Sequence, residues 1–176
     1  MSARNPAIGA ATVREWSRAL APNSPILDLG CGHGVPISQT LTEQGFTVYG
    51  VDASATLIAA FRKRFPNTHL ECAAVEDSEF FHRSFEGIVA WGLMFLLLPS
   101  VQAGIIRKVA RALTPGGRFL FTSPAEHRTW FDVLTGRESI SLGRRRYQQI
   151  LHAEGLILTG EEVDEGQNHY YFVSKP

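Results

Sequence analysis

Three glycines at alternate positions, closely preceded by an acid, form the segment with the clearest chemical meaning. The sequence runs Asp28-Leu-Gly30-Cys-Gly32-His-Gly34 between a predicted strand and a predicted helix. Glycines permit a sharp bend and a close approach of a ligand, and the first N–H groups of a helix have no partners within it. In a dinucleotide fingerprint the third glycine follows the second by three residues and a pyrophosphate lies on the helix. Here it comes one residue earlier, and the preceding carboxylate favours a ligand with an ammonium group.

A second acid, Asp52, ends the next predicted strand, 22 residues after Gly30. A carboxylate about 20 residues beyond such a glycine loop can accept hydrogen bonds from the hydroxyls of a ribose. The alternative is that Asp52 only caps the helix that follows it. The combination of loop and acid favours the ribose interpretation.

The elements that must position these groups alternate between strands and helices. The expected strands cover 25–30, 46–52, 69–75, 87–91, 117–123, 156–163 and 170–174. The expected helices cover 36–44, 55–65, 100–113 and 144–154, and the stretch 124–142 is expected to be a mixed loop. The last two strands are joined by a short Asp-Glu-Gly-Gln-Asn turn, which favours an antiparallel hairpin. This order predicts one α/β domain over residues 1–176, with a parallel sheet between helices.

The loop, the acid and the strand pattern together resemble the class I S-adenosylmethionine-dependent methyltransferases. Val48-Tyr-Gly-Val-Asp-Ala-Ser54 and Leu113-Thr-Pro-Gly-Gly-Arg-Phe-Leu120 are similar to later motifs of that family. The resemblance covers about residues 24–123 in motifs and extends to the C-terminus in strand pattern. It implies a Rossmann-like, doubly wound, seven-stranded sheet in the order 3-2-1-4-5-7-6 with the last strand antiparallel. It also implies S-adenosylmethionine as the cofactor.

The same resemblance assigns cofactor-binding residues along the first two strands. It places Asp28 near the amino group of the cofactor, with Asp52 on the ribose hydroxyls and Ala53 beside the adenine. The loop along the methionine part of the cofactor comprises Gly30, Cys31, Gly32 and Gly34, and Ala90 at the end of the fourth strand completes this part of the site.

The adenine end of the expected site departs from the family pattern. Many members have an Asp-Ala pair after the third strand, whereas this chain has Ala74-Val75 there. Glu76 or Asp77 could replace the missing acid, or either could be a solvated residue at a helix start. The backbone of Val75 can still contact the edge of the adenine.

The acceptor side is expected at the carboxyl ends of the fourth and fifth strands, since ligands of open parallel sheets bind there. By resemblance, Trp91 lies near the transferred methyl, and its segment lacks the Asn-Pro-Pro-Tyr pattern of enzymes that methylate nucleic-acid amino groups. Trp130 and Tyr170 are expected to add aromatic surface for a small organic acceptor. The alternative is that Trp91 only packs in the hydrophobic core, and that Trp130 only anchors its loop on that core.

Two histidines are candidates for a general base, because histidine exchanges protons near neutral pH. His127 follows the fifth strand, and His169 stands where the antiparallel last strand begins at the same edge of the sheet. Each could instead be an ordinary loop residue. The acceptor molecule, its reacting atom and the oligomeric state are left open by the sequence.

Composition excludes several classes of partner. The chain has 17 basic and 17 acidic residues, without the basic excess usual for nucleic-acid binding. It has no apolar run long enough to span a membrane, no His/Cys cluster with metal-ligand spacing, and only two cysteines, Cys31 and Cys72. The first residues lack the apolar core of a secretory signal, so a cytoplasmic location is expected.

We therefore predict methyl transfer from S-adenosylmethionine to a small molecule by in-line displacement. One alternative is a protein that binds S-adenosylmethionine without catalysis. A less favoured alternative is a nicotinamide-dependent reductase, against which the early third glycine argues.

Overall fold

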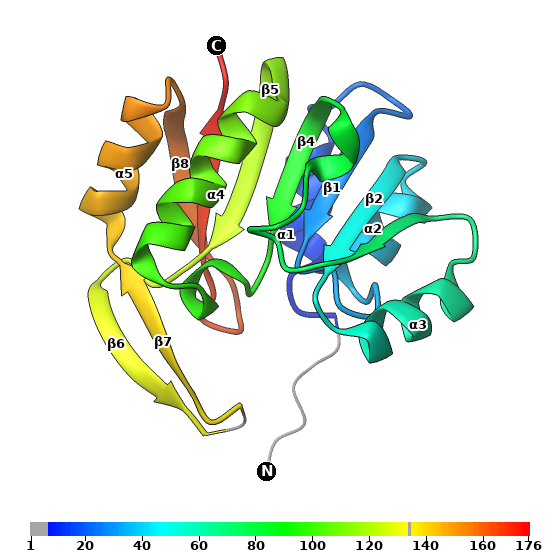
Figure 1. Ribbon diagram of the computed structural model, residues 1–176. Coiled ribbons are helices and arrows are strands. Elements are labelled where there is room, and N and C mark those ends of the chain that lie inside the picture. The colour runs from blue at the N-terminus through cyan, green and yellow to red at the C-terminus, as the bar shows by residue number, and fades with distance from the viewer. Residues whose placement is uncertain (1–6, 134) are drawn as a thin grey trace.

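A computed structural model describes residues 7–133 and 135–176, and within them seven strands form one sheet in the order β3-β2-β1-β4-β5-β9-β8 (Figure 1). The strands are β1 (Pro25–Leu29), β2 (Thr47–Asp52), β3 (His69–Cys72), β4 (Phe85–Ala90), β5 (Leu113–Thr122), β8 (Ile157–Val163) and β9 (His169–Ser174). β1 to β5 are parallel, and β9 pairs antiparallel with both β5 and β8. The predicted sheet order and the antiparallel last strand are confirmed.

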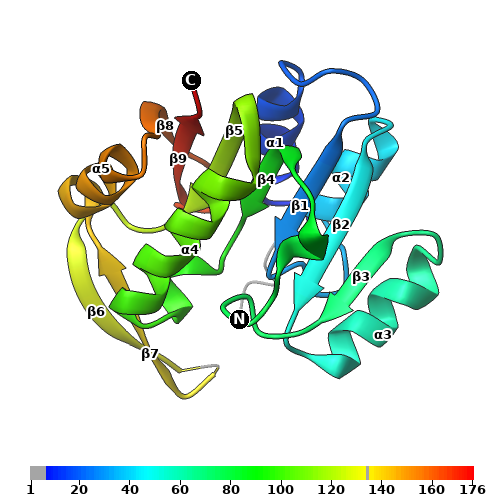
Figure 2. The same ribbon diagram turned by 45° about the horizontal axis from the view of Figure 1, so that its top comes forward.

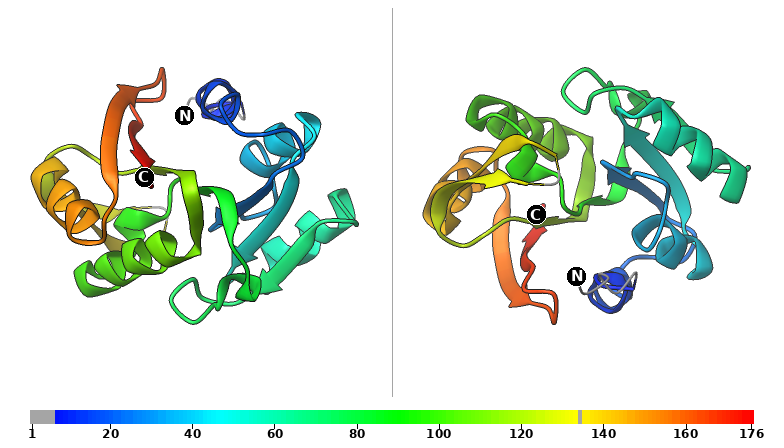
Figure 3. Two further views of the ribbon diagram at one scale, coloured as in Figure 1. Left: turned by 90° about the horizontal axis from the view of Figure 1, so that it is seen from above. Right: turned by 90° about the horizontal axis from the view of Figure 1, so that it is seen from below.

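Helices cover both faces of this sheet (Figure 3). They are α1 (Ala10–Ser17), α2 (Ile37–Glu43), α3 (Ala55–Arg64), α4 (Pro99–Ala112) and α5 (Arg144–Ala153), with short 3-10 turns at Phe80–His82 and Met94–Leu96. Ser54 caps α3 by accepting a hydrogen bond from the Leu57 N–H at 3.2 Å, as its position before the helix predicts. Pro99 opens α4, where a proline costs no helical hydrogen bond.

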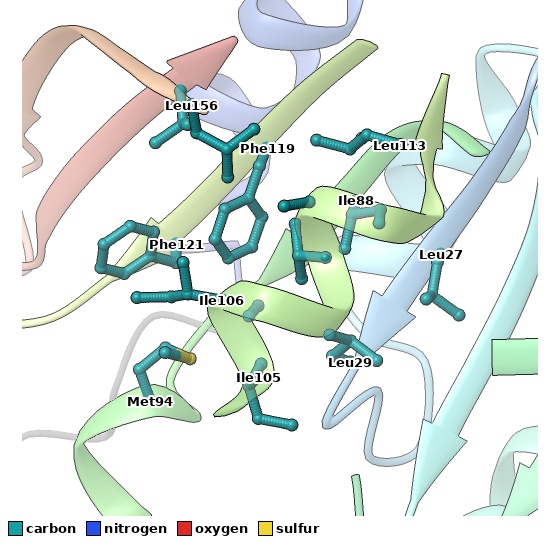
Figure 4. Packing of buried hydrophobic residues seen from close by; sticks show 14 of the residues in the cluster. Leu27, Leu29, Ile88, Met94, Ile105, Ile106, Leu113, Phe119, Phe121 and Leu156 are labelled. Atoms are coloured by element: carbon teal, nitrogen blue, oxygen red, sulfur yellow. The ribbon is translucent and has the colours of Figure 1, made fainter. Parts of the chain in front are cut away.

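The core has two layers because alternate residues of a strand point to opposite faces. Leu27, Leu29, Ile88, Phe119 and Phe121 pack under α4 and α5 (Figure 4). Their neighbours along the same strands, Ile26, Val89 and Leu120, form the second layer with Tyr170 of β9, Trp16 of α1 and Leu41 of α2. The sheet therefore lies between two apolar layers.

The expectation of a mixed loop over 124–142 is wrong. This stretch contains two paired strands, β6 (His127–Asp132) and β7 (Arg137–Leu142), which form a separate antiparallel hairpin. Two of the side chains that it buries are serines, Ser139 and Ser141, so the apolar alternation that indicates a strand is absent. Figures 1 and 2 show this hairpin projecting beyond the carboxyl edge of the sheet, below β5 and α5.

Smaller differences concern the ends of elements. β3 ends at Cys72 rather than near Val75, and β5 begins at Leu113 rather than Gly117. α1 was not expected from the sequence. Over the described part of the chain, no helix is both long and apolar enough to cross a bilayer.

Candidate functional site

The glycine loop between β1 and α2 is tied to the neighbouring strand β2. The N–H groups of Gly30 and Cys31 both donate to the carbonyl of Val51, at 2.8 and 3.1 Å. Gly32 has a φ of +56°, which other residues rarely adopt, and a Cβ built on it meets no atom of the described chain within 4 Å. One side of the loop backbone is thus fixed against the sheet, while Gly32 borders open space.

Asp28, on β1 just before this loop, is only 2% exposed. Ser38 of α2 donates a hydrogen bond from Oγ to its Oδ2 at 2.6 Å. Burial raises the pKa of Asp28 to about 7, the bond from Ser38 opposes this rise, and the negative charge of Asp52 adds to it. A cation close to Asp28 would favour its charged form.

Asp52, at the end of β2, is bound to the glycine loop. Its Oδ2 accepts a hydrogen bond from the Gly32 N–H at 2.9 Å, and its Oδ1 accepts one from the Ser54 N–H at 2.8 Å. The side-chain cap of α3 is Ser54 rather than Asp52. Each oxygen of Asp52 retains a lone pair, so the carboxylate could still accept bonds from hydroxyl groups.

Three further residues expected to contact the cofactor, Cys31, Ala53 and Ala90, differ in how far their side chains are exposed to solvent. Cys31 is buried, and burial with the nearby charges of Asp28 and Asp52 raises the pKa of its thiol. Ala53 is exposed at the end of β2, and Ala90 is fully buried at the end of β4. Together they follow the carboxyl edge of three neighbouring strands, β2, β1 and β4.

The segment after β3 is held by Lys108 of α4. Its Nζ donates to the carbonyls of Val75 at 3.2 Å and Glu76 at 3.1 Å, and also to that of Ser78. Val75 is buried, whereas the side chain of Glu76 is exposed. The Val75 carbonyl is therefore already engaged by Lys108.

A cavity of about 730 Å³ lies beyond the ends of β4 and β5. Its sides come from the segment around Phe95, the β6–β7 hairpin and the turn between β8 and β9. The aromatic lining residues are Trp91, Phe95, Trp130 and Phe131, and polar ones include Glu126, Arg128, Gln167, Asn168 and His169. A volume of this size suits a small organic molecule.

The hairpin supplies an aromatic wall to this cavity. The rings of Trp130 and Phe95 lie 5.5 Å apart between centroids, and the guanidinium of Arg128 lies 5.1 Å from the Trp130 ring centroid. Phe131 is 67% exposed. Trp130 therefore faces the cavity from the hairpin and is not buried in the main core. The contact of Trp130 with Phe95 was not expected from the sequence.

His169, at the start of β9, lines the cavity and is paired with an acid. Its Nε2 lies 2.8 Å from Oε1 of Glu161, and the same oxygen accepts a bond from Nε of Arg144 at 2.8 Å. Burial raises the pKa of Glu161, but the hydrogen bonds from His169 and Arg144 outweigh it, so the pKa is lowered. Glu161 is thus a carboxylate that orients the imidazole, leaving Nδ1 as the other nitrogen.

The remaining two predicted residues differ from His169 in their surroundings. His127 is exposed on β6 and is not among the residues that line the cavity. Tyr170 is fully buried, and its hydroxyl bonds Trp91 and Asp164 instead of bordering the cavity. Glu161 and Asp164 were missed, because their partners are set by pairing across the β8–β9 hairpin.

Metal ligands are not gathered in the described residues. In 7–133 and 135–176, no group of three or more His, Cys, Asp or Glu side chains could hold a metal ion. Cys31 and Cys72 are both free thiols.

Comparison of the sequence with known proteins identifies its central segment. A family model described as a methyltransferase domain matches residues 26–117. An uncharacterized methyltransferase of Synechocystis is 29% identical over 112 residues, which cover 64% of this chain and 52% of that protein. A ubiquinone biosynthesis O-methyltransferase of Nitrobacter winogradskyi is 33% identical over 116 residues, covering 63% of this chain and 42% of that protein. The chain spans about half the length of the curated relatives it matches.

Comparison of the fold extends the likeness to nearly the whole chain. The glycopeptide N-methyltransferase MtfA matches with a TM-score of 0.75 at 18% identity, covering 96% of each chain. The Burkholderia thailandensis 1,6-didemethyltoxoflavin-N1-methyltransferase, solved with its namesake compound and S-adenosylhomocysteine, matches with a TM-score of 0.76 at 18% identity, covering 95% of this chain and 77% of that one. Because the family model spans more than half of the chain, the protein belongs to the methyltransferase-domain family, and it has the fold of the class I S-adenosylmethionine-dependent methyltransferases.

Proposed function

We propose that this protein transfers a methyl group from S-adenosylmethionine to a small organic acceptor. The proposal rests on the carboxyl edge of the sheet, which carries two acids at a glycine loop and an aromatic cavity lined by His169, whose imidazole is paired with Glu161. The related ubiquinone biosynthesis O-methyltransferases and the toxoflavin N-methyltransferase, by their names, methylate small molecules, which supports this choice.

The residues at the glycine loop fit S-adenosylmethionine. Asp28 is a buried carboxylate whose charged form a ligand ammonium group would favour, and Asp52 offers two oxygens to ribose hydroxyls. Gly32 borders open space where a side chain would obstruct a ligand lying along the loop. We propose that the backbone of Gly30, Cys31 and Gly34, in the same loop, also contacts the cofactor. When bound, this cofactor supplies a methyl group on a positively charged sulfur, which is electrophilic without further activation.

The adenine would lie toward β2 and β3, which lack the usual acid after the third strand. We propose that Ala53 and Val75 contact its ring and edge, with the Val75 N–H as the donor. We propose that Glu76, whose carbonyl accepts a bond from Lys108 and whose side chain is exposed, contributes to the same region. Ala90 would contact the methionine part of the cofactor from the end of β4.

The cavity residues would align the acceptor, which is the protein's main task in a displacement reaction. We propose that Trp91 and Trp130 contact a flat acceptor from the strand side and from the hairpin side. Their aromatic faces also displace water from the reacting atoms. Such a surface suits a planar acceptor better than a strongly charged, flexible one.

His169 is proposed as the general base for an acceptor that must lose a proton. Glu161 accepts the Nε2–H, which fixes the tautomer and leaves Nδ1 unprotonated to take the proton. The resulting imidazolium would be stabilised by the Glu161 carboxylate. His127 lies outside the cavity, so the proposal does not use it.

We propose that residues 1–176 form one catalytic domain and that this domain acts in the cytoplasm. The free thiols of Cys31 and Cys72 and the balanced charge support a reducing compartment and a small-molecule partner rather than a nucleic acid.

The test measures binding and then turnover. Isothermal titration should show micromolar binding of S-adenosylhomocysteine and none of NAD. Release of S-adenosylhomocysteine should then be screened against phenols, nitrogen heterocycles and amines, with an acceptor-free reaction as the control. Release that depends on an acceptor supports the proposal. Tight cofactor binding with no release across the panel would favour the non-catalytic alternative, and preference for NAD would favour a reductase.

A further inference from the structure

A buried carboxylate, Asp164, lies at the join between two walls of the acceptor cavity. It begins the β8–β9 turn, is 8% exposed, and does not itself line the cavity. Its Oδ1 accepts hydrogen bonds from the backbone N–H groups of Gly166 at 2.8 Å and Asn168 at 2.9 Å, and Asn168 Nδ2 lies 3.1 Å from both oxygens. One carboxylate therefore shapes the turn that brings Asn168 and His169 to the cavity.

The second oxygen of Asp164 reaches the opposite wall through a tyrosine. The Tyr170 hydroxyl donates to Asp164 Oδ2 at 2.7 Å and accepts a bond from Nε1 of Trp91 at 2.9 Å. Tyr170 is fully buried, and it packs with Leu120 and Val89. The Tyr170 hydroxyl has one proton, which it donates to Asp164. A lone pair on the same oxygen therefore accepts the bond from Trp91, so the donor and the acceptor of both bonds are determined.

Charges reinforce this arrangement. Burial raises the pKa of Asp164, but the bonds from Tyr170, Asn168 and Gly166 outweigh it and lower the pKa. Burial and the bond to Asp164 raise the pKa of Tyr170, so its hydroxyl stays a donor at neutral pH. The chain Asp164–Tyr170–Trp91 thus remains in one hydrogen-bonded state under ordinary conditions.

Backbone packing leaves the Trp91 ring little room to find another position. A Cβ built on Gly9 would lie 2.8 Å from Trp91 Nε1, so the backbone of that glycine closely approaches the indole. The other side of Trp91 borders the cavity, next to Gly92, whose N–H donates to Thr122 Oγ1 at 2.8 Å. Gly9 therefore restricts the indole on one side, and the bond to Tyr170 fixes its N–H.

We infer that Asp164 and Tyr170 are positioning residues, which hold the Trp91 indole and the Asn168–His169 segment in register across the acceptor cavity. This inference rests on the proposed function for its catalytic consequence, but not for the geometry itself. It assigns Tyr170 an indirect role in acceptor binding, through Trp91, and it adds Asp164 to the residues that determine the shape of the site.

The first experiment needs no substrate. In ¹⁵N-labelled protein, the indole N–H resonance of Trp91 is assigned with Trp91→Phe, and Trp16 serves as the internal reference. In Tyr170→Phe, exchange of the Trp91 indole proton with solvent should be at least about tenfold faster, since its acceptor is gone. Tyr49→Phe is the matched control, because it removes another buried hydroxyl, the partner of Arg83, away from the cavity. An unchanged exchange rate of the Trp91 indole proton in folded Tyr170→Phe overturns the inference.

The second experiment uses an acceptor found in the release screen. Tyr170→Phe and Asp164→Asn should raise the KM for the acceptor by about fivefold or more while changing S-adenosylhomocysteine affinity less than twofold. Glu165→Gln, an exposed acid of the same turn, should change neither. The double variant should lose less than the product of the single losses, because both substitutions break one network.

The outcomes separate the two proposals. Normal turnover by both folded variants contradicts the positioning role even if methyl transfer is established. A wild-type protein that turns over no acceptor contradicts the proposed function, and the exchange of the Trp91 indole proton still decides whether Tyr170 orients that ring.

Discussion

The two halves of the site are built differently. On the cofactor side, Asp28, the glycine loop and Asp52 come from one strand–loop–helix–strand unit, 25 residues long from Asp28 to Asp52, and are joined by direct bonds such as that from Gly32 to Asp52. On the acceptor side, Trp91, Trp130 and His169 come from three distant segments and meet only around a cavity. The cofactor half is thus local and prearranged, whereas the acceptor half depends on the placement of a projecting hairpin and a turn.

This contrast predicts that the two halves can be varied separately. The residues that line the cavity include none from β1, the glycine loop or β2, so replacement of residues in the hairpin or in the β8–β9 turn is expected to leave the β1–β2 unit unchanged. Variants on each side should therefore affect different steps.

The largest effect is expected at His169. Removal of its imidazole in His169→Ala should lower methyl transfer by about a hundredfold or more for an acceptor that must lose a proton. Affinity for S-adenosylhomocysteine should stay within about twofold, because the loss falls on the transfer step. His127→Ala is the matched control, an exposed histidine outside the cavity. Equal losses in both variants would remove His169 from the mechanism.

The next effect is expected at Asp52. Asp52→Ala should weaken S-adenosylhomocysteine binding by about 2 kcal/mol, roughly thirtyfold, because ribose hydroxyls lose a charged acceptor and the glycine loop loses its tie. Titration calorimetry measures this, with the exposed Glu43 replaced by alanine as the control. Unchanged affinity in a folded Asp52→Ala protein would show that this acid serves the loop alone.

A smaller effect is expected at the aromatic wall. Trp130→Ala should lower kcat/KM for the acceptor by about tenfold, since one flat contact surface is lost, while cofactor affinity remains unchanged. Trp130→Phe should recover much of the loss because it retains a ring against Phe95. If the alanine variant instead weakens cofactor binding, the two halves are not separate.

The smallest effect is expected in the pH dependence of cofactor binding, which tests the titration of Asp28. Asp28 has a raised pKa of about 7, so lowering the pH from about 8 to about 6 protonates it and should weaken S-adenosylhomocysteine binding by up to about tenfold. Asp28→Asn should show no such slope. In the free protein the folded pKa exceeds the unfolded value of 3.8, so Asp28 contributes stability below about pH 4 that is lost as the pH rises toward 7. A slope shared by both proteins would place the titrating group elsewhere.

The sequence by itself predicted the sheet and the residues that we propose for the cofactor half. Short apolar strands, glycines and acids at strand ends follow from chain-local requirements, so the segment from Asp28 to Asp52 could be interpreted without contacts from elsewhere. The order of the strands followed from the family resemblance and was confirmed by the pairing of β1 with both β2 and β4.

Only the tertiary structure decided the acceptor half. The β6–β7 hairpin escaped prediction because Ser139 and Ser141 give no apolar alternation, and its position over the cavity depends on contacts with Phe95. The bonds from His169 to Glu161 and from Tyr170 to Asp164 depend on the register of β8 against β9 and on the turn between them. Such partners lie only a few residues away along the chain, yet a shift of one residue would turn each side chain to the opposite face of the sheet, so their contacts follow from strand register rather than from sequence spacing.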